Sequence, residues 1–271
     1  MGTSAFTATL LLDGSEIYKT SAAKLHPLGT RGFTRDGRVY RYARNGATAI
    51  VPGDLIQASV VLAAGSEVAA ELADSTDWAV PTTNSTSIRL STDTSLSTAN
   101  FFEDGYFMVT AGTTTSEVGQ IAQIESHPGN AGAAGATGAP IVYLYTEDKL
   151  VTALTTANTI SMNKNTYDAV VVADNADSAI TAMPVGVCPA AVAVEYYFWL
   201  QTWGLCPVWT HGTADAGRSV FFSSSTGSSR GGDVHAPSTV DNESAGCVSV
   251  GMSQYIGVTG TCGAVMLTLA P

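Results

Sequence analysis

Charged side chains are scarce in this sequence. They make up 13% of its 271 residues, against about 25% in an ordinary soluble domain. The surface must therefore take its polarity from Ser, Thr, Asn, Gly and Ala. That is unusual for a helical enzyme, because exposed helical turns favour Glu, Lys and Arg. The composition is typical of an extended, β-rich protein with much of its surface covered by partners.

Positive charge and long apolar runs are also lacking. There are 12 Lys and Arg residues against 23 Asp and Glu, a net charge of −11, which argues against a nucleic-acid partner because phosphate affinity comes from Lys and Arg. The most apolar stretch, AAVAVEYYFWL at 190–200, contains Glu195 and is far shorter than a bilayer span. The first residues lack the basic region and apolar core of a signal peptide. We therefore expect a soluble chain with no membrane partner and no export signal.

Cysteine is limited to four residues in the last third of the chain: Cys188, Cys206, Cys247 and Cys262. None forms a C-x-x-C pair, so a zinc or thioredoxin-like site has little support. Two disulfides are arithmetically possible. Buried free thiols are the favoured interpretation.

Turn signals dominate the N-terminal part. Asp36-Gly37 and Asn45-Gly46 are typical of two-residue type I′ hairpin turns. They predict a three-stranded meander with strands at 32–35, 38–44 and 47–51. In this register Phe33 lies beside Tyr40 and Tyr42 beside Ala49.

The meander also concentrates positive charge, since five of the twelve Lys and Arg residues lie within residues 31–46. Arg and Tyr are enriched where protein partners anchor. We therefore predict a contact surface for a protein partner or a sister subunit, made of Arg31, Arg35, Arg38, Arg41, Arg44, Tyr40 and Tyr42. Two alternatives stay open: a solvated hairpin whose arginines pair with the chain's own carboxylates, and a phosphate site.

The rest of the chain also reads as short strands separated by turns. Residues 54–74 are ambiguous, because EVAAELA at 67–73 could form two helical turns. We predict an all-β fold of several small antiparallel barrel or sandwich modules joined by short linkers. The expected parts are an extended N-terminal arm at 1–30, a β-meander and connector at 31–74, a central β module at 75–166 and a C-terminal module at 167–271.

One strand candidate, VEYYFWLQTW, is apolar on both faces. Tyr197, Trp199 and Trp203 point one way, and Tyr196, Phe198 and Leu200 point the other. Either both faces are covered within the same domain, or a neighbouring subunit covers the second face, because large apolar patches rarely stay bare. Under the second interpretation Tyr197, Trp199 and Trp203 are interface aromatics.

A search for catalytic chemistry finds no constellation. GSSRG at 227–231 has the letters of a hydrolase elbow around Ser229, but no helix follows it. The histidines (His26, His127, His211 and His235) are widely separated and have no ligand spacing. We expect no enzyme activity, no cofactor and no metal.

Three stretches together resemble a family of tailed-phage virion proteins, the capsid decoration (cement) or head structural proteins. They are LHPLGTRGFTRDGRVYRYARNGATAIVPGDLIQA, FFEDGYFMVTAG with GQIAQIESH, and PVGVCPAAVAVEYYFWLQTWGLCPVWTHGTADAGRSV. The resemblance covers roughly residues 26–220, mostly through LGTR…DGRVYRY and YFWLQTWG. It implies an all-β protein on the exterior of an icosahedral head, assembled in the bacterial cytoplasm. The implied partners are the major capsid protein and further copies of the chain, with a trimer favoured.

Two other functions remain as alternatives. A carbohydrate-binding β-module of a tail or head fibre would stack sugar rings on Trp203 and Trp209. A serine hydrolase would use Ser229.

Overall fold

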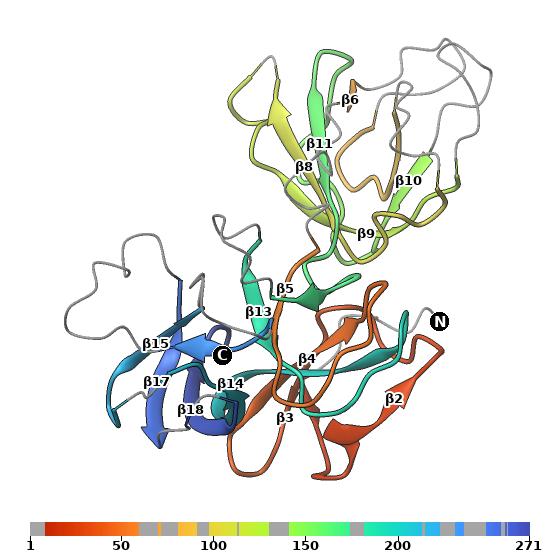
Figure 1. The fold of residues 1–271 in the computed structure, drawn as a ribbon. Helices are drawn as coiled ribbons and strands as arrows, with labels where there is room; N and C mark the ends of the chain where they lie inside the picture. Colours follow the sequence, from red (N-terminus) through yellow and green to blue (C-terminus); the bar gives the residue numbers. More distant parts are fainter. Residues whose placement is uncertain are drawn as a thin grey trace. The chain divides into compact units, whose positions relative to one another are not determined.

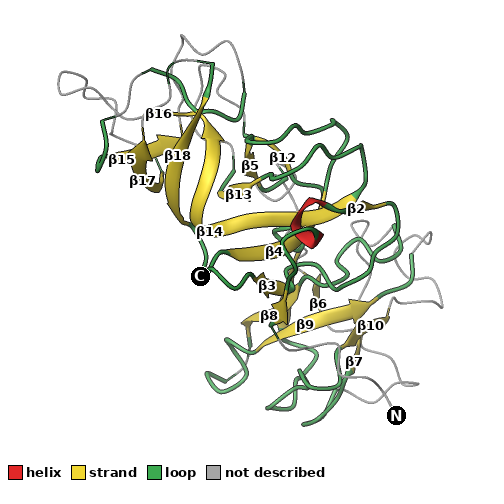
Figure 2. Cartoon of the chain, turned by 90° about the horizontal axis from the view of Figure 1, so that it is seen from below, coloured by secondary structure: helices red, strands yellow, loops and turns green. Residues whose placement is uncertain are grey.

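The computed structural model describes residues 9–59, 70–71, 81–90, 98–112, 114–129, 141–173, 182–212, 215–222, 231–235, 248–255, 258 and 260–271. These residues fall into two compact units (Figure 1). Those within Ala64–Asn165 form the central unit, and those within Thr7–Ala63 and Thr166–Pro271 form the composite unit. The described residues are strands and loops with one 3-10 turn at Glu16–Tyr18 (Figure 2), so the all-β prediction is confirmed.

The central unit is one antiparallel sheet with strand order β6-β11-β8-β9-β10-β7. Its strands are β6 (Ala70–Glu71), β7 (Ser87–Arg89), β8 (Tyr106–Ala111), β9 (Ile121–Ser126), β10 (Ile141–Leu144) and β11 (Thr159–Asn163). Alternate residues of β8 and β11 point inward, where Phe107, Ile160 and Met162 pack with Phe102 in one apolar core. Because β6 pairs with β11, the helix considered for 67–73 is wrong at Ala70–Glu71.

The composite unit is built around a sheet of twelve strands, counted over the described residues. Its main path runs β1-β3-β4-β14-β18-β17-β15-β16, with β2, β5, β12 and β13 attached beside it. The bounds are β1 (Leu10–Leu11), β2 (Thr20–Ser21), β3 (Arg31–Phe33), β4 (Val39–Arg44), β5 (Leu55–Gln57), β12 (Val171–Val172), β13 (Pro184–Val187), β14 (Tyr197–Trp209), β15 (Ser219–Phe222), β16 (Val234–His235), β17 (Ser249–Tyr255) and β18 (Cys262–Thr268). Neither sheet closes on itself, so the described strands do not form the barrels that were one of the two predicted forms of the modules.

The long strand β14 organises this unit and can be followed in Figure 2. Its first half pairs with β4 and its second half with β18. Phe198 and Leu200 enter one apolar cluster, and Trp199 enters another on the opposite face. Both faces of the strand are therefore covered within its own unit from Phe198 to Thr202, as the first of the two interpretations held, whereas Trp203 is exposed.

The first hairpin differs from the predicted register. Phe33 lies opposite Val39 instead of Tyr40. Gly37 N–H bonds Thr34 O at 2.9 Å, Thr34 N–H bonds Arg38 O at 3.0 Å, and Gly37 has φ +84°. This is the three-residue loop of a type I turn followed by a left-handed glycine. An Asp-Gly pair fits either loop, and here the Thr34 hydroxyl favours the longer one by bonding Asp36.

The second predicted hairpin does not form, because β4 pairs with the distant β14 instead of residues 47–51. Asn45 is fully buried and ends β4. Its side-chain amide donates to Thr48 O at 2.8 Å and to Ala193 O at 2.9 Å. Asn45-Gly46 thus fixes the exit of a central strand, a role that the dipeptide alone does not reveal.

The module boundaries also differ from the predicted ones. Residues 10–30 belong to the composite unit instead of a free arm, because Leu12, Ile17 and Leu28 are buried with Tyr40, Tyr42 and Trp199. The predicted meander and C-terminal module share one sheet. Strand pairing between β4 and β14 joins these distant parts of the chain.

Candidate contact surfaces

The five arginines of the predicted contact surface differ in whether they form ion pairs within the chain. Arg38 Nε bonds Asp36 Oδ2 at 2.8 Å, and Arg44 bonds Asp168 at 2.6 Å and Glu195 at 3.1 Å. A hydrogen bond from the Thr34 hydroxyl, with Arg38 beside it, lowers the pKa of the Asp36 carboxyl. Arg38 and Arg44 are therefore engaged by the chain's own carboxylates, the alternative left open above.

The tyrosines of the predicted surface are in the core. Tyr40 and Tyr42 are buried, and Tyr42 packs on Trp199 at a ring-centroid distance of 5.2 Å. The Tyr40 hydroxyl donates to Gln201 Oε1 at 3.3 Å, and burial raises the pKa of Tyr40. Both side chains are inaccessible to a partner, which corrects their assignment. The same correction applies to Trp199, while Tyr197 is half-buried against this cluster.

The remaining three arginines have no ion pair among the described residues. Arg35 is exposed at the hairpin tip, and Arg31 is half-buried on β3. Arg41 is also half-buried and donates to Gly29 O at 3.2 Å and Pro271 O at 3.3 Å. These are the cationic groups of the cluster that a partner could engage.

A second surface lies on the outer side of β14, β18 and β17. After Thr202 alternate residues of β14 turn outward, and Trp203 and Leu205 are 36% and 45% exposed. Leu205 lies opposite Met266 on β18, and Met266 lies opposite Met252 on β17. Cross-strand partners share a face. We name this surface the outer apolar face and define it by Trp203, Leu205, Pro207, Met252, Tyr255 and Met266.

The outer apolar face carries no charge on its strands, since β14 from Trp203 onward, β17 and β18 contain no Asp, Glu, Lys or Arg. At one margin Trp203, Leu205, Pro207 and Met266 share a shallow hollow with Asp36 and Arg38. The opposite side of these strands is the core that contains Cys206, Val208, Val250, Val265 and Leu267. The surface is therefore apolar, uncharged and rimmed by one ion pair.

Sequence reasoning found only Trp203 of this face. The sequence does indicate strands with two apolar faces in TWGLCPVW and AVMLTL, because apolar residues occupy positions that point to both sides of the sheet. The rest of the face was missed because a sequence does not show which side is covered by the same chain.

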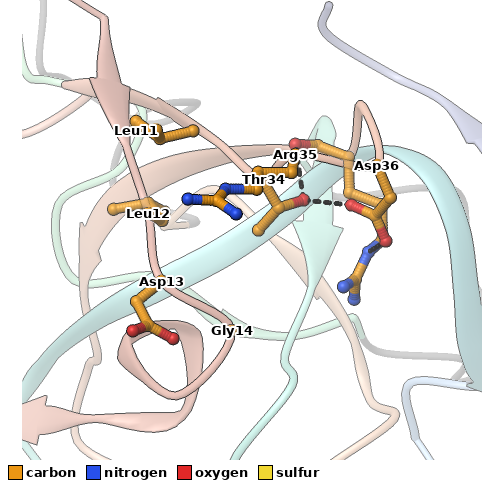
Figure 3. Close-up of a pocket in the computed structure, with 8 residues that line it drawn as sticks. Leu11, Leu12, Asp13, Gly14, Thr34, Arg35 and Asp36 are labelled. Atoms are coloured by element: carbon orange, nitrogen blue, oxygen red, sulfur yellow. Dashed lines mark hydrogen bonds and ion pairs between the residues drawn. The ribbon is translucent and has the colours of Figure 1, made fainter.

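A hollow of about 520 Å³ lies between the β1 end and the first hairpin (Figure 3). Leu11, Leu12, Asp13, Thr34 and Arg35 are among its lining residues. Figure 3 shows the Arg35 side chain extending toward Leu12 and Asp36 turned toward Thr34. The lining contains no Cys, Ser or His. The hollow is large enough to hold a side chain.

Reactive groups are not gathered elsewhere in the described part of the chain. No three His, Cys, Asp or Glu side chains there lie close enough to hold a metal, and no helix there could span a membrane. Ser229 lies outside the described residues. Cys188 and Cys206 are buried free thiols, and burial raises the pKa of Cys188 to about 12.

Comparison of the chain with protein-family models, curated proteins and solved structures finds no match.

Proposed function

We propose that this chain is a virion structural protein that binds the outside of an icosahedral phage head and stabilises it by bridging major capsid protein subunits. Such a protein needs contact area and a stable scaffold. The resemblance noted in the sequence supports the proposal, as does the low content of charged residues.

The outer apolar face is the observation that carries the proposal. It spans three neighbouring strands and contains large apolar side chains, four of which are at least 36% exposed: Trp203, Leu205, Met252 and Tyr255. Apolar patches that bring several such residues together mark contact sites in soluble proteins. Large, rigid strand residues such as Trp203 anchor interfaces well, because they lose little conformational freedom on binding.

Bridging requires a second surface, and the central unit offers one. Met108 on β8 lies opposite Ile121 on β9, and Ile121 is 61% exposed. Tyr106 is exposed two residues along β8 from Met108. Each unit thus presents its own apolar patch, so a single copy has two surfaces with which to join neighbouring capsid subunits.

The test is occupancy on purified heads of the phage that encodes the chain, measured by stained gel after sedimentation. The double variant L205E/M266E places two carboxylates on the outer apolar face. We expect at least about a tenfold loss of affinity, since burying unpaired charge at an interface costs more than 1.4 kcal/mol. The control is V151E, at a 78% exposed residue of the central unit. Unchanged occupancy of L205E/M266E, or a wild-type chain that never binds heads, would contradict the proposal.

Carbohydrate binding remains the second candidate because Trp203 is exposed beside the polar rim of Asp36 and Arg38. Aromatic rings flanked by polar groups are suited to sugar rings. Trp209 is less available, since its indole N–H donates to Pro52 O at 2.8 Å. A change in tryptophan fluorescence on adding soluble sugars, lost in W203A and kept in W209F, would favour this function.

A further inference from the structure

Arg31 and Arg41 lie side by side on two adjacent strands. They are directly opposite in the antiparallel pair of β3 and β4. Like charges in this relationship repel, because Cβ atoms of opposed residues are only about 5 Å apart. In a chain with 23 Asp and Glu residues against 12 Lys and Arg, an opposed pair of arginines needs an explanation.

The hydrogen-bonding capacity of this pair is partly unused. The Nε atoms of Arg31 and Arg41 are both buried and have no acceptor. Arg41 places its two terminal nitrogens on main-chain oxygens, those of Gly29 and Pro271. Within the described residues, Asp or Glu side chains pair with Arg38, Arg44 and Arg218, and no Asp or Glu pairs with Arg31 or Arg41. Buried donors without acceptors are costly, so the arginine pair lowers the stability of the isolated chain.

Apolar residues lie next to the arginine pair in the strand register. Phe33 and Val39 form the next pair on the same face, and Leu11 lies beside Phe33 on β1. Leu11 is 55% exposed and Phe33 is half-buried. This face of β1, β3 and β4 therefore combines two cations with apolar contact area.

We infer that Arg31 and Arg41 together bind one carboxylate side chain, an Asp or Glu of the protein surface that this chain covers. The inference rests on the proposed function and names the chemistry of its partner. Guanidinium groups match a carboxylate in geometry, and such charge-assisted bonds are the strongest hydrogen bonds at protein surfaces. A nucleic acid would instead bring many phosphates against a chain of net charge −11. A single acid within an apolar protein surface matches both the cations and Leu11 and Phe33.

The pair should then destabilise the free chain and favour the bound one. R31Q removes one of the two opposed charges and keeps most of the side-chain stem. We expect the melting temperature of the isolated chain to rise by about 2 °C and its affinity for purified heads to fall by about tenfold. Raising NaCl should weaken wild-type binding more steeply than R31Q binding, because wild type has one more charge in contact. K19Q is the control, since Lys19 is an exposed cation of the same unit that the contact surface does not include and that has no ion pair in the described residues; both its melting temperature and its affinity should match wild type.

The two readouts together identify a binding role. Loss of binding without stabilisation would mean that Arg31 supports the fold, and stabilisation without loss of binding would mean that the pair meets no partner acid. Either result overturns the inference while leaving the proposed function in place. A wild-type chain that fails to bind heads refutes the proposed function itself.

Discussion

Arg44 on β4 donates a hydrogen bond from Nε to Oδ1 of Asp168 at 2.6 Å, joining chain segments 124 residues apart. Asp168 is almost fully buried, so its carboxylate depends on this partner. We expect R44A to lower the free energy of unfolding of the composite unit by about 2 kcal/mol. Denaturant unfolding followed by tryptophan fluorescence measures it.

The control for this prediction is R38A, which breaks an ion pair with a solvent-exposed Asp36. Exposed pairs contribute about 0–1 kcal/mol. Equal effects of R44A and R38A would contradict the special role of the Arg44–Asp168 bond.

Gly186 lets β13 approach β14 closely. A Cβ atom at this position would lie 2.6 Å from the main-chain oxygen of Gln201 and 2.6 Å from Leu200 Cγ. We expect G186A to destabilise the composite unit by about 2–3 kcal/mol, because the backbone oxygen cannot move aside without breaking the sheet. G14A is the comparison, since nothing lies within 4 Å of its new methyl group; thermal unfolding of both variants gives the difference.

His127 should make the central unit sensitive to acid. Its Nε2 accepts the Phe102 N–H at 3.1 Å, and burial lowers the pKa of the imidazole below its usual 6.5. The unfolded chain then binds the proton more readily, so stability is complete above pH 6.5 and falls as the pH decreases below it. We expect amide exchange at Phe102, corrected for intrinsic rates, to accelerate at pH 5 relative to pH 7.5. An H127Q variant with the same pH dependence as wild type would rule out this histidine as the cause.

The buried thiols should be unreactive in the folded chain. Cys188 and Cys206 are buried, and burial raises the pKa of both above the usual thiol range. We expect the variant C188A/C206A to show the same number of thiols reacting with Ellman's reagent as wild type in native buffer. In guanidinium chloride it should show two fewer. A reduced count in native buffer would mean that one of these cysteines is accessible.

Much of the fold class could be predicted from local signals. The alternation in β9, the aromatic and β-branched residues of β8 and β14, and the glycine-containing turns are properties of short stretches, and they correctly predicted an all-β chain. The exact loop at Asp36-Gly37 was not predictable, because two loop lengths accept the same dipeptide and a side-chain bond from Thr34 decides between them.

The candidate surfaces were less predictable than the fold. Arg31 and Arg44 look equivalent in the sequence. In the structure Arg44 forms an ion pair with Asp168 of a distant segment, whereas Arg31 lies opposite another arginine on the neighbouring strand. Tyr40 looked like an anchor for a partner but is covered by the chain's own Leu12 and Trp199. Leu205 and Met266 lie in visibly apolar stretches, but the sequence does not show that they share an exposed face, since their pairing joins strands that are far apart in the chain.

The sequence by itself determined an all-β chain with few charges and with five of its eight arginines within residues 31–46, because strand periodicity, turn residues and composition act over short distances. Only the tertiary structure decided which arginines lack an Asp or Glu partner and which apolar strand face is exposed to solvent. Those outcomes depend on pairings such as Tyr40 with Gln201, 161 positions apart, and local sequence does not encode the neighbour that a strand will find.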